Sequence, residues 1–297
     1  MVTMALSTQL EYGVLGDSCD FIFSIQAAYT PRQTVVQELL VTGHGSAISY
    51  YTDPNTGSRF VSLRAAKGTL QISYSAVVNL THFEAAPSEL FECSPLALPG
   101  AVLPYLFPSR YCQSDRLMAF ANQQFGHLPP GYSRAQAVCD WVTSNVQFQS
   151  NTSNSSTSAI DTVVDRVGVC RDFAHLMIAL CRALSLPARM VSGMDYGADP
   201  ALGAPDFHAY VEVYLADAND QKWGQGRWYM FDPSGTAIPM GFVRFCTGRD
   251  AADIAFATIF GNVTTAQPIT HIMAVPDAQG QLRIPERVSY ALSTDGA

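Results

Sequence analysis

Apolar and polar residues alternate along much of the N-terminal part of the chain. In the stretch QISYSAVVNL, residues 71–80, one face carries five apolar side chains: Ile72, Tyr74, Ala76, Val78 and Leu80. Residues 20–27 and 33–41 show a less regular form of the same alternation. A period of two residues is typical of a strand with one buried face. We therefore predict an antiparallel β domain over residues 1–90.

Five prolines then occur close together, at positions 87, 95, 99, 104 and 108. Proline fixes φ and removes a backbone donor, so such a segment disfavours both a long helix and a central strand. We place an interdomain linker at residues 91–110. The rest of the chain, residues 111–297, is the second predicted domain, and it ends in a β extension.

Beyond the linker the apolar period changes to about 3.6 residues, the period of an amphipathic helix. One helix is predicted from about 114 to 126. The next begins at Ser133, where Gln136 three residues later completes a capping-box pattern. The polar segment 149–158 indicates a surface loop, and a short helix is predicted after it over residues 159–167.

The segment RVGVCRDFAHLMIALCRALSLPARMVSG predicts a buried helix that begins at Cys170 and ends before Pro187. Its main apolar stripe consists of Phe173, Leu176, Met177, Leu180 and Leu184. Three strands are predicted to follow, at 188–194, at 206–215 and from Arg227 to Asp232. Helices packed on an antiparallel sheet, preceded by a β domain, give an α+β fold class.

Composition excludes some classes of function. The length of 297 residues corresponds to about two domains, and a hydrophobic content of 48% is enough for large cores. The formal net charge of -8 argues against nucleic acid or an anionic membrane as a partner. We find neither an apolar run long enough for a membrane helix nor a signal peptide, so we expect a cytoplasmic protein.

The seven cysteines are scattered and include no Cys-X-X-Cys motif. An odd number with irregular spacing favours reduced thiols over a disulfide framework or a zinc site. We therefore expect neither a metal nor a cofactor. Cys170 is distinguished by its place at a helix start, where unpaired backbone N–H groups and the macrodipole favour a thiolate. This position indicates a nucleophile, and its backbone N–H points to where a substrate oxyanion would lie.

A nucleophilic thiol needs a base, and the sequence offers two histidines near it. His175 is in the same helix, but helical rotation turns it by roughly 140° from Cys170, so we expect a core role. His208, on the strand 206–215, is the better candidate. Asp232 ends the next strand and can accept the other ring N–H of His208, which fixes the tautomer. Asp172 is expected to complement the helix N-terminus.

Other residues near this trio remain open in interpretation. Tyr210 and Glu212 share a strand face with His208, and either cleft lining or packing fits them. The loop 194–206, rich in Gly, Pro and Ala, fits a substrate rim or a connector equally well.

The blocks GVCRDFAHL, DFHAYVEVYL and RWYMFDPSG resemble the three signature blocks of the bacterial transglutaminase-like superfamily. The segments YLFPSRYCQSD and VRFCTGRDAADIAFATIFG resemble flanking segments of a bacterial subgroup described as cysteine proteases, which also carries an N-terminal β domain. The resemblance implies a papain-like core with a Cys-His-Asp triad. Cys170 then corresponds to the nucleophile, His208 to the base and Asp232 to the residue that orients the base.

The resemblance implies acyl transfer through a thioester, on a peptide or protein substrate. Water as the acceptor makes the enzyme a peptidase or amidase, which is the activity associated with the subgroup, whereas a lysine amine makes it a transglutaminase. A scaffold on a retired catalytic fold is the alternative of another class, and the intact trio argues against it. Animal transglutaminases use an upstream Trp as second oxyanion donor. Here Trp141, which lies on an apolar stripe, and Gln147 or Gln149 remain alternatives for that donor. The sequence does not indicate an oligomeric state.

Overall fold

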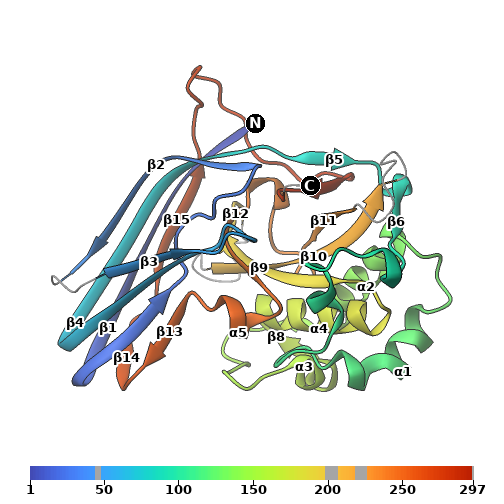
Figure 1. The fold of residues 1–297 in the computed structure, drawn as a ribbon, viewed down its shortest axis with the longest axis horizontal. Helices are drawn as coiled ribbons and strands as arrows, with labels where there is room; N and C mark the ends of the chain where they lie inside the picture. The colour runs from blue at the N-terminus through green and yellow to red at the C-terminus, as the bar shows by residue number, and fades with distance from the viewer. Residues whose placement is uncertain (44–47, 198–206, 218–225, 296–297) are drawn as a thin grey trace.

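The computed structural model describes residues 1–43, 48–197, 207–217 and 226–295 (Figure 1). It has a mixed α+β architecture, with a long antiparallel sheet at one end and a smaller antiparallel sheet covered by helices at the other. The predicted fold class is therefore confirmed.

The N-terminal sheet is built around two 22-residue strands, β1 (Val2–Phe23) and β4 (Arg59–Leu80), which pair along most of their length. On the far side of β4 lie β2 (Gln33–Thr42) and β3 (Ile48–Thr52). The predicted apolar face of residues 71–80 is confirmed, because all five of its side chains are buried in one cluster. The alternation thus fixes which face of β4 forms the core.

The C-terminal part of the chain returns to this same sheet. Three strands pair antiparallel with β1: β13 (Ala257–Phe260), β14 (Val263–Thr265) and β15 (Ile269–Ala274). The β extension expected at the C-terminus thus lies in the N-terminal sheet (Figure 1). The division at residues 90 and 110 stays a prediction.

The second sheet has the strand order β11 (Gly226–Phe231), β10 (Phe207–Asp217), β9 (Ala188–Met194) and β12 (Val243–Gly248). A short strand from the proline-rich segment, β6 (Leu90–Glu92), pairs with the end of β10. Two small ladders complete the strands: β5 (Phe83–Ala85) with β16 (Ala291–Ser293), and the parallel pair β7 (Gln147–Phe148) and β8 (Val167–Gly168).

The helices are α1 (Ser114–Phe125), α2 (Tyr132–Asn145), α3 (Ala159–Asp165), α4 (Cys170–Ala183) and α5 (Ala251–Ile254). Short 3₁₀ turns with proline in their first turn occupy η1 (Pro87–Glu89), η2 (Pro95–Ala97), η3 (Leu103–Leu106) and η5 (Pro239–Gly241). Helix α4 is central, because it contacts α1, α2 and α3 on one side and β9 and β10 on the other. This explains why its residues 172–183 are all buried.

The predicted start of α2 is wrong. The helix begins at Tyr132, with Gly131 as its N-cap at φ 133°, and Ser133 lies inside it. A Cβ on residue 131 would lie 2.7 Å from the Leu90 carbonyl oxygen, so glycine is needed there. Glu92 accepts the Gly131 N–H at 2.9 Å and also pairs with Arg134. A carboxylate from β6 therefore replaces the local capping box.

The two sheets share a hydrophobic core. Met194 and Val243 of the second sheet belong to the same buried cluster as the apolar face of β1 and β4. Tyr74 of β4 meets Phe245 of β12 edge-on, with ring centroids 6.4 Å apart. The Tyr74 hydroxyl also accepts the Ala27 N–H at 3.1 Å. These contacts pack the N-terminal sheet against the second sheet, so it forms one wall of the space between them.

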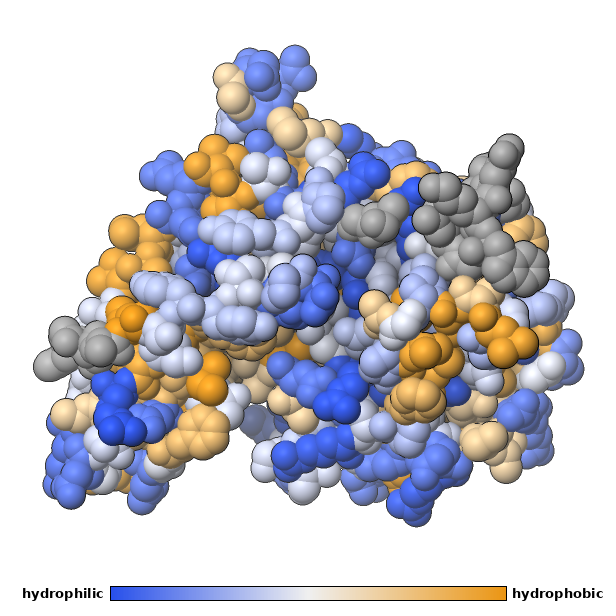
Figure 2. All heavy atoms as spheres, in the orientation of Figure 1, coloured by the Kyte–Doolittle hydropathy of each residue, from blue (hydrophilic) through white to orange (hydrophobic). Residues whose placement is uncertain are grey.

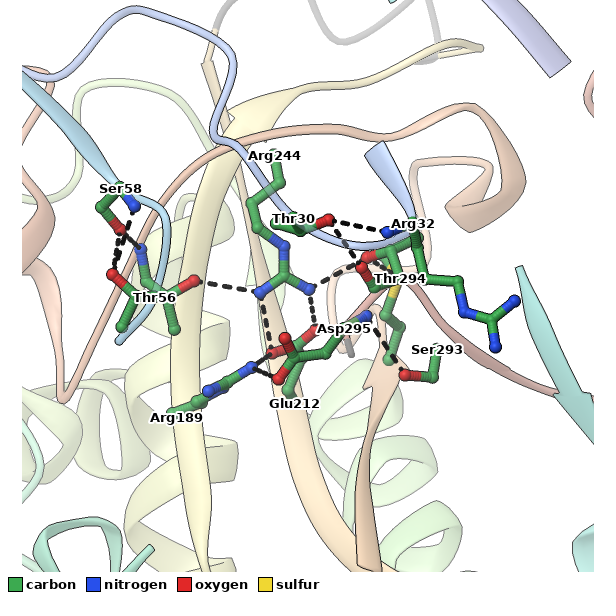
Figure 3. A network of polar contacts seen from close by, with 12 residues as sticks. Thr30, Arg32, Thr56, Ser58, Arg189, Glu212, Arg244, Ser293, Thr294 and Asp295 are labelled. Carbon is green, nitrogen blue, oxygen red and sulfur yellow. Dashed lines mark hydrogen bonds and ion pairs between the residues drawn. The ribbon is translucent and has the colours of Figure 1, made fainter. Parts of the chain in front are cut away.

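A buried ion-pair network holds the second sheet to the C-terminal segment (Figure 3). Glu212 of β10 pairs with Arg189 of β9 and Arg244 of β12. Arg189 also pairs with Asp295, and Arg244 donates to the Thr294 hydroxyl at 2.9 Å. Side chains of Arg189, Arg244 and Glu212 are at most 7% exposed, so these charges interact in a poorly screened environment. The network fixes β9, β10 and β12 relative to one another.

Candidate active site

Cys170 is the first residue of α4 and the least buried of the seven cysteines, the other six being buried. Its thiol donates a long hydrogen bond to the Phe207 carbonyl oxygen, with 3.9 Å between the two atoms. The thiol therefore lies where the start of α4 meets the start of β10. This is the helix N-terminal position that the sequence predicted.

The turn into α4 is held by Asp172. Its Oδ2 accepts the Val169 N–H at 2.8 Å, which confirms the expected role at the helix N-terminus. Burial raises the pKa of Asp172 above its ordinary value. A Cβ on residue 168 would lie 2.7 Å from the Asp172 Cβ, so Gly168 lets the chain pass close to this side chain.

His208 and Asp232 meet across β10 and the end of β11. Nε2 of His208 lies 3.3 Å from Oδ1 of Asp232, and both side chains are less than one-tenth exposed. Asp232 is held in turn by the Ser234 hydroxyl at 2.6 Å and the Ala237 N–H at 2.9 Å. Because Nε2 faces Asp232, Nδ1 is the ring nitrogen left for the thiol.

Electrostatics favour the charged form of the imidazole. Burial lowers the pKa of His208, but the hydrogen bond to Asp232 and then that to Cys170 outweigh it and raise this pKa well above the ordinary value. Burial raises the pKa of Asp232, yet the hydrogen bonds from His208, Ser234 and Ala237 together hold it below its ordinary value. The arrangement is that of an imidazolium flanked by a carboxylate and a sulfur.

Cys170 and His208 line a cleft of about 670 Å³. Phe207 and Asp195 border it from the second sheet, while Ser24 and Gln267 border it from segments next to the N-terminal sheet. The outline of the molecule is indented between the N-terminal sheet and the helices (Figure 2). The cleft therefore lies between the two parts of the fold, a common place for small-molecule and peptide sites.

The three alternatives for a second oxyanion donor lie outside the described lining of this cleft. Trp141 packs edge-on against Phe120, with ring centroids 5.3 Å apart, and Arg166 stacks over its ring at 4.8 Å. Gln147 and Gln149 are exposed and are likewise not among the described cleft residues. Trp141 is therefore a packing residue, and the second donor remains a prediction.

Part of the polar segment 149–158, which was expected to be a surface loop, reaches the cleft. Ser150, Asn151 and Ser153 line it. Asn151 has a φ of 64°, a left-handed conformation that is uncommon outside glycine. Sequence reasoning missed these residues because a run of small polar side chains is equally typical of any exposed loop.

The remaining neighbours of the trio have structural partners. His175 accepts the Ala251 N–H on Nε2 at 3.2 Å and stacks on Tyr111, so its expected core role is confirmed. Tyr210 and Glu212 are fully buried and lie outside the described cleft lining; Glu212 belongs to the ion-pair network (Figure 3). Residues 198–206 of the loop 194–206 lie outside the described residues.

Asp195 is a cleft residue that the sequence did not single out, although it lies in the loop 194–206 that fits a substrate rim or a connector. It follows β9 directly and is 5% exposed. The Tyr210 hydroxyl donates to its Oδ1 at 3.0 Å, and the Ile238 N–H donates to its Oδ2 at 3.3 Å. Burial raises the pKa of Asp195 to about 7.

Two sequence families match this chain. Residues 118–233 match the transglutaminase-like superfamily, and residues 2–97 match the N-terminal domain of bacterial transglutaminases. A solved structure, described as a putative cysteine protease from Cytophaga hutchinsonii, is 36% identical, with 98% of this chain and 97% of that chain covered and a TM-score of 0.88. The chain therefore belongs to the transglutaminase-like superfamily.

Two mycobacterial relatives are uncharacterized proteins. The one from Mycobacterium leprae is 25% identical over 238 residues, which cover 77% of this chain and 83% of that protein. The one from Mycobacterium tuberculosis is 30% identical over 147 residues. This match covers 46% of that protein, so this chain spans about half of that protein's length. They place the chain among bacterial relatives without assigning an activity.

The part of the chain that the structure describes offers neither a metal cluster nor a membrane helix. Within the described ranges, no group of three His, Cys, Asp or Glu side chains is close enough to hold a metal ion. Among the same residues, no helix combines the length and the apolar character needed to cross a bilayer.

Proposed function

We propose that this protein is a thiol-dependent acyl-transfer enzyme that hydrolyses peptide or amide bonds. The observation that carries the proposal is that Cys170, at a helix start, lines one cleft with His208, whose Nε2 lies 3.3 Å from Oδ1 of Asp232. Membership of the transglutaminase-like superfamily, and the likeness to a protein described as a cysteine protease, support the same reaction class.

In the first half-reaction the Cys170 thiolate attacks the amide carbonyl carbon and forms a C–S bond. Backbone N–H groups at the start of α4 hold the oxyanion that develops. The C–N bond then breaks, and His208 gives its proton to the departing amine. The product is a thioester, with the acyl group on Cys170 and a neutral imidazole on His208.

In the second half-reaction His208 takes a proton from the acceptor. With water as acceptor, the oxygen attacks the thioester carbonyl, the C–S bond breaks and the acid leaves. Cys170 and His208 return to their starting charges. Asp232 remains ionised throughout and stabilises the imidazolium whenever it is present.

The experiment is turnover of a fluorogenic peptide library, with and without an added primary amine, by wild type and Cys170→Ala. Peptide release without amine, abolished by the substitution, supports hydrolysis. Amine incorporation with little release shows a transglutaminase instead. If both proteins are inactive on every substrate and wild-type Cys170 reacts like an ordinary thiol, the chain is a non-catalytic scaffold and the proposal is wrong.

A further inference from the structure

One acidic side chain in the cleft wall has no role in the proposed thioester chemistry. Asp195 lines the cleft that holds Cys170 and His208. It also lines a second cavity of about 720 Å³, bordered by β1 and β15. Asp195 thus lies between the two cavities.

The hydrogen bonds to Asp195 come from neutral groups. Tyr210 donates its hydroxyl to one oxygen and Ile238 donates its backbone N–H to the other. Tyr210 is fully buried and meets the His208 ring edge-on, with ring centroids 4.9 Å apart. These contacts fix the orientation of the carboxyl group.

Among the described residues, Asp195 takes part in no ion pair with lysine or arginine. The cation that acts on it is His208, which lies 3.3 Å from Asp232. Arg171 is also in the cleft wall, but its guanidinium donates to the Ser153 hydroxyl at 2.6 Å. A buried carboxylate without its own counter-charge is costly, and a ligand cation removes that cost.

We infer that Asp195 is a specificity-determining residue, which binds an ammonium group carried by the substrate whose acyl group is transferred to Cys170. The ammonium would come from a free α-amino group or from a lysine-like side chain near the scissile amide. This inference rests on the proposed function for the acyl transfer, but the cation site itself can be tested without turnover.

Thiol-modifying reagents provide that test, because the other six cysteines are buried. The rate of Cys170 modification is measured at pH 8 with cationic 2-aminoethyl methanethiosulfonate and with neutral methyl methanethiosulfonate. The ratio of the two rates reports the preference for a cation and cancels any change in thiolate reactivity. Asp195→Asn is expected to lower this ratio about tenfold and to change the neutral rate less than twofold.

Asp20→Asn is the matched control, because it removes the same charge from an exposed ion pair with Arg64. It should leave the ratio unchanged. An equal loss of both rates in Asp195→Asn shows that Asp195 only positions His208, and an unchanged ratio shows that it binds no cation. Either result overturns the inference.

A titration of the wild type replaces the substitution should Asp195→Asn fail to fold. The ratio is expected to rise between pH 6 and 8, as Asp195 ionises with a pKa of about 7. The groups that face it are His208 and Tyr210 from β10 and Asp232 beyond β11. The hydrogen bonds to Asp232 and Cys170 raise the pKa of His208, which favours its charged form. A ratio that is flat with pH contradicts the inference.

Turnover then identifies the source of the ammonium. Peptides with free and with acetylated N-termini are compared, each with and without a lysine side chain. Asp195→Asn is expected to raise KM for the preferred cationic peptide about tenfold and to leave neutral peptides within twofold. A cation preference in labelling, with no turnover and with Cys170 reacting like an ordinary thiol, leaves the Asp195 site standing and refutes the proposed function alone.

Discussion

His208 Nε2 and Asp232 Oδ1 lie 3.3 Å apart, although 24 residues separate them in the chain. The separation is closed by the antiparallel pairing of β10 with β11, in which Val211 faces Phe231. The strand carrying His208 is also fastened by the Glu212 network four positions further along (Figure 3). The geometry of the proposed site is therefore set by the sheet rather than by a flexible loop.

Replacing Asp232 by asparagine should separate the effect of the Asp232 charge on His208 from the effect of Asp232 packing. Asp232→Asn keeps much of the side-chain shape, while it removes the charge that supports an imidazolium on His208. We expect kcat/KM to fall about a thousandfold or more, with little loss of fold. Steady-state kinetics with circular dichroism checks this, and near-normal activity in a folded variant would show that Asp232 does not act through His208.

Trp141→Phe tests the choice among oxyanion donors. Because Trp141 packs against Phe120 and Phe125, phenylalanine keeps most of the contact and removes the indole N–H. We expect a stability cost of about 1–2 kcal/mol and kcat within about threefold of wild type. A hundredfold loss of kcat at unchanged stability would instead assign Trp141 to the oxyanion site.

The Glu212 network should matter for stability rather than chemistry. Glu212→Gln leaves the guanidinium groups of Arg189 and Arg244 buried with less compensation. We expect a loss of about 3–5 kcal/mol in the free energy of unfolding. Urea unfolding measures it, and Asp20→Asn, at an exposed ion pair, is the control that should barely move the midpoint. Similar midpoints for the two variants would contradict this role.

The buried His175 should make the free energy of unfolding depend on pH. Burial lowers its pKa to about 3 in the folded protein, whereas an unfolded chain has a histidine pKa of about 6.5. Between these values the unfolded state binds the extra proton, so folding weakens as pH falls, by about 1.4 kcal/mol per pH unit from this residue. The loss begins below about pH 6.5 and is complete near the folded pKa.

His175→Gln isolates this contribution, because glutamine can still accept the Ala251 N–H but does not titrate. Urea unfolding of wild type and variant at pH 7, 6 and 5 should show a shallower decline in the variant. His82, whose pKa burial lowers to about 4, contributes equally to both proteins. Parallel declines would show that His175 is not buried in its neutral form.

The sequence predicted what depends on local periodicity. The apolar face of β4 and the helix that begins at Cys170 follow from periods of two and about 3.6 residues, and both are found. Strand placement, supported by the resemblance, selected His208 and Asp232, which the sheet brings together. Such features are visible because each is written within a short stretch of chain.

What the sequence did not predict depends on contacts between distant segments. No local pattern shows that β15 pairs with β1, since strand pairing is decided by the whole fold. Glu92 supplies the N-terminal partner of α2 from another strand, which a local capping rule cannot anticipate. Asp195 belongs to the cleft only because Tyr210 and Ile238 hold it there.

The most direct test of the central claim is the reactivity of Cys170 itself. Iodoacetamide is added at pH 6, and mass spectrometry follows alkylation of each of the seven cysteines in wild type and His208→Ala. Activation by His208 predicts that Cys170 reacts before the other cysteines and faster than glutathione under the same conditions. In His208→Ala, the rate of Cys170 alkylation should be lower by about tenfold or more. A Cys170 that reacts no faster than glutathione, or equally fast in His208→Ala, would contradict the enzymatic account.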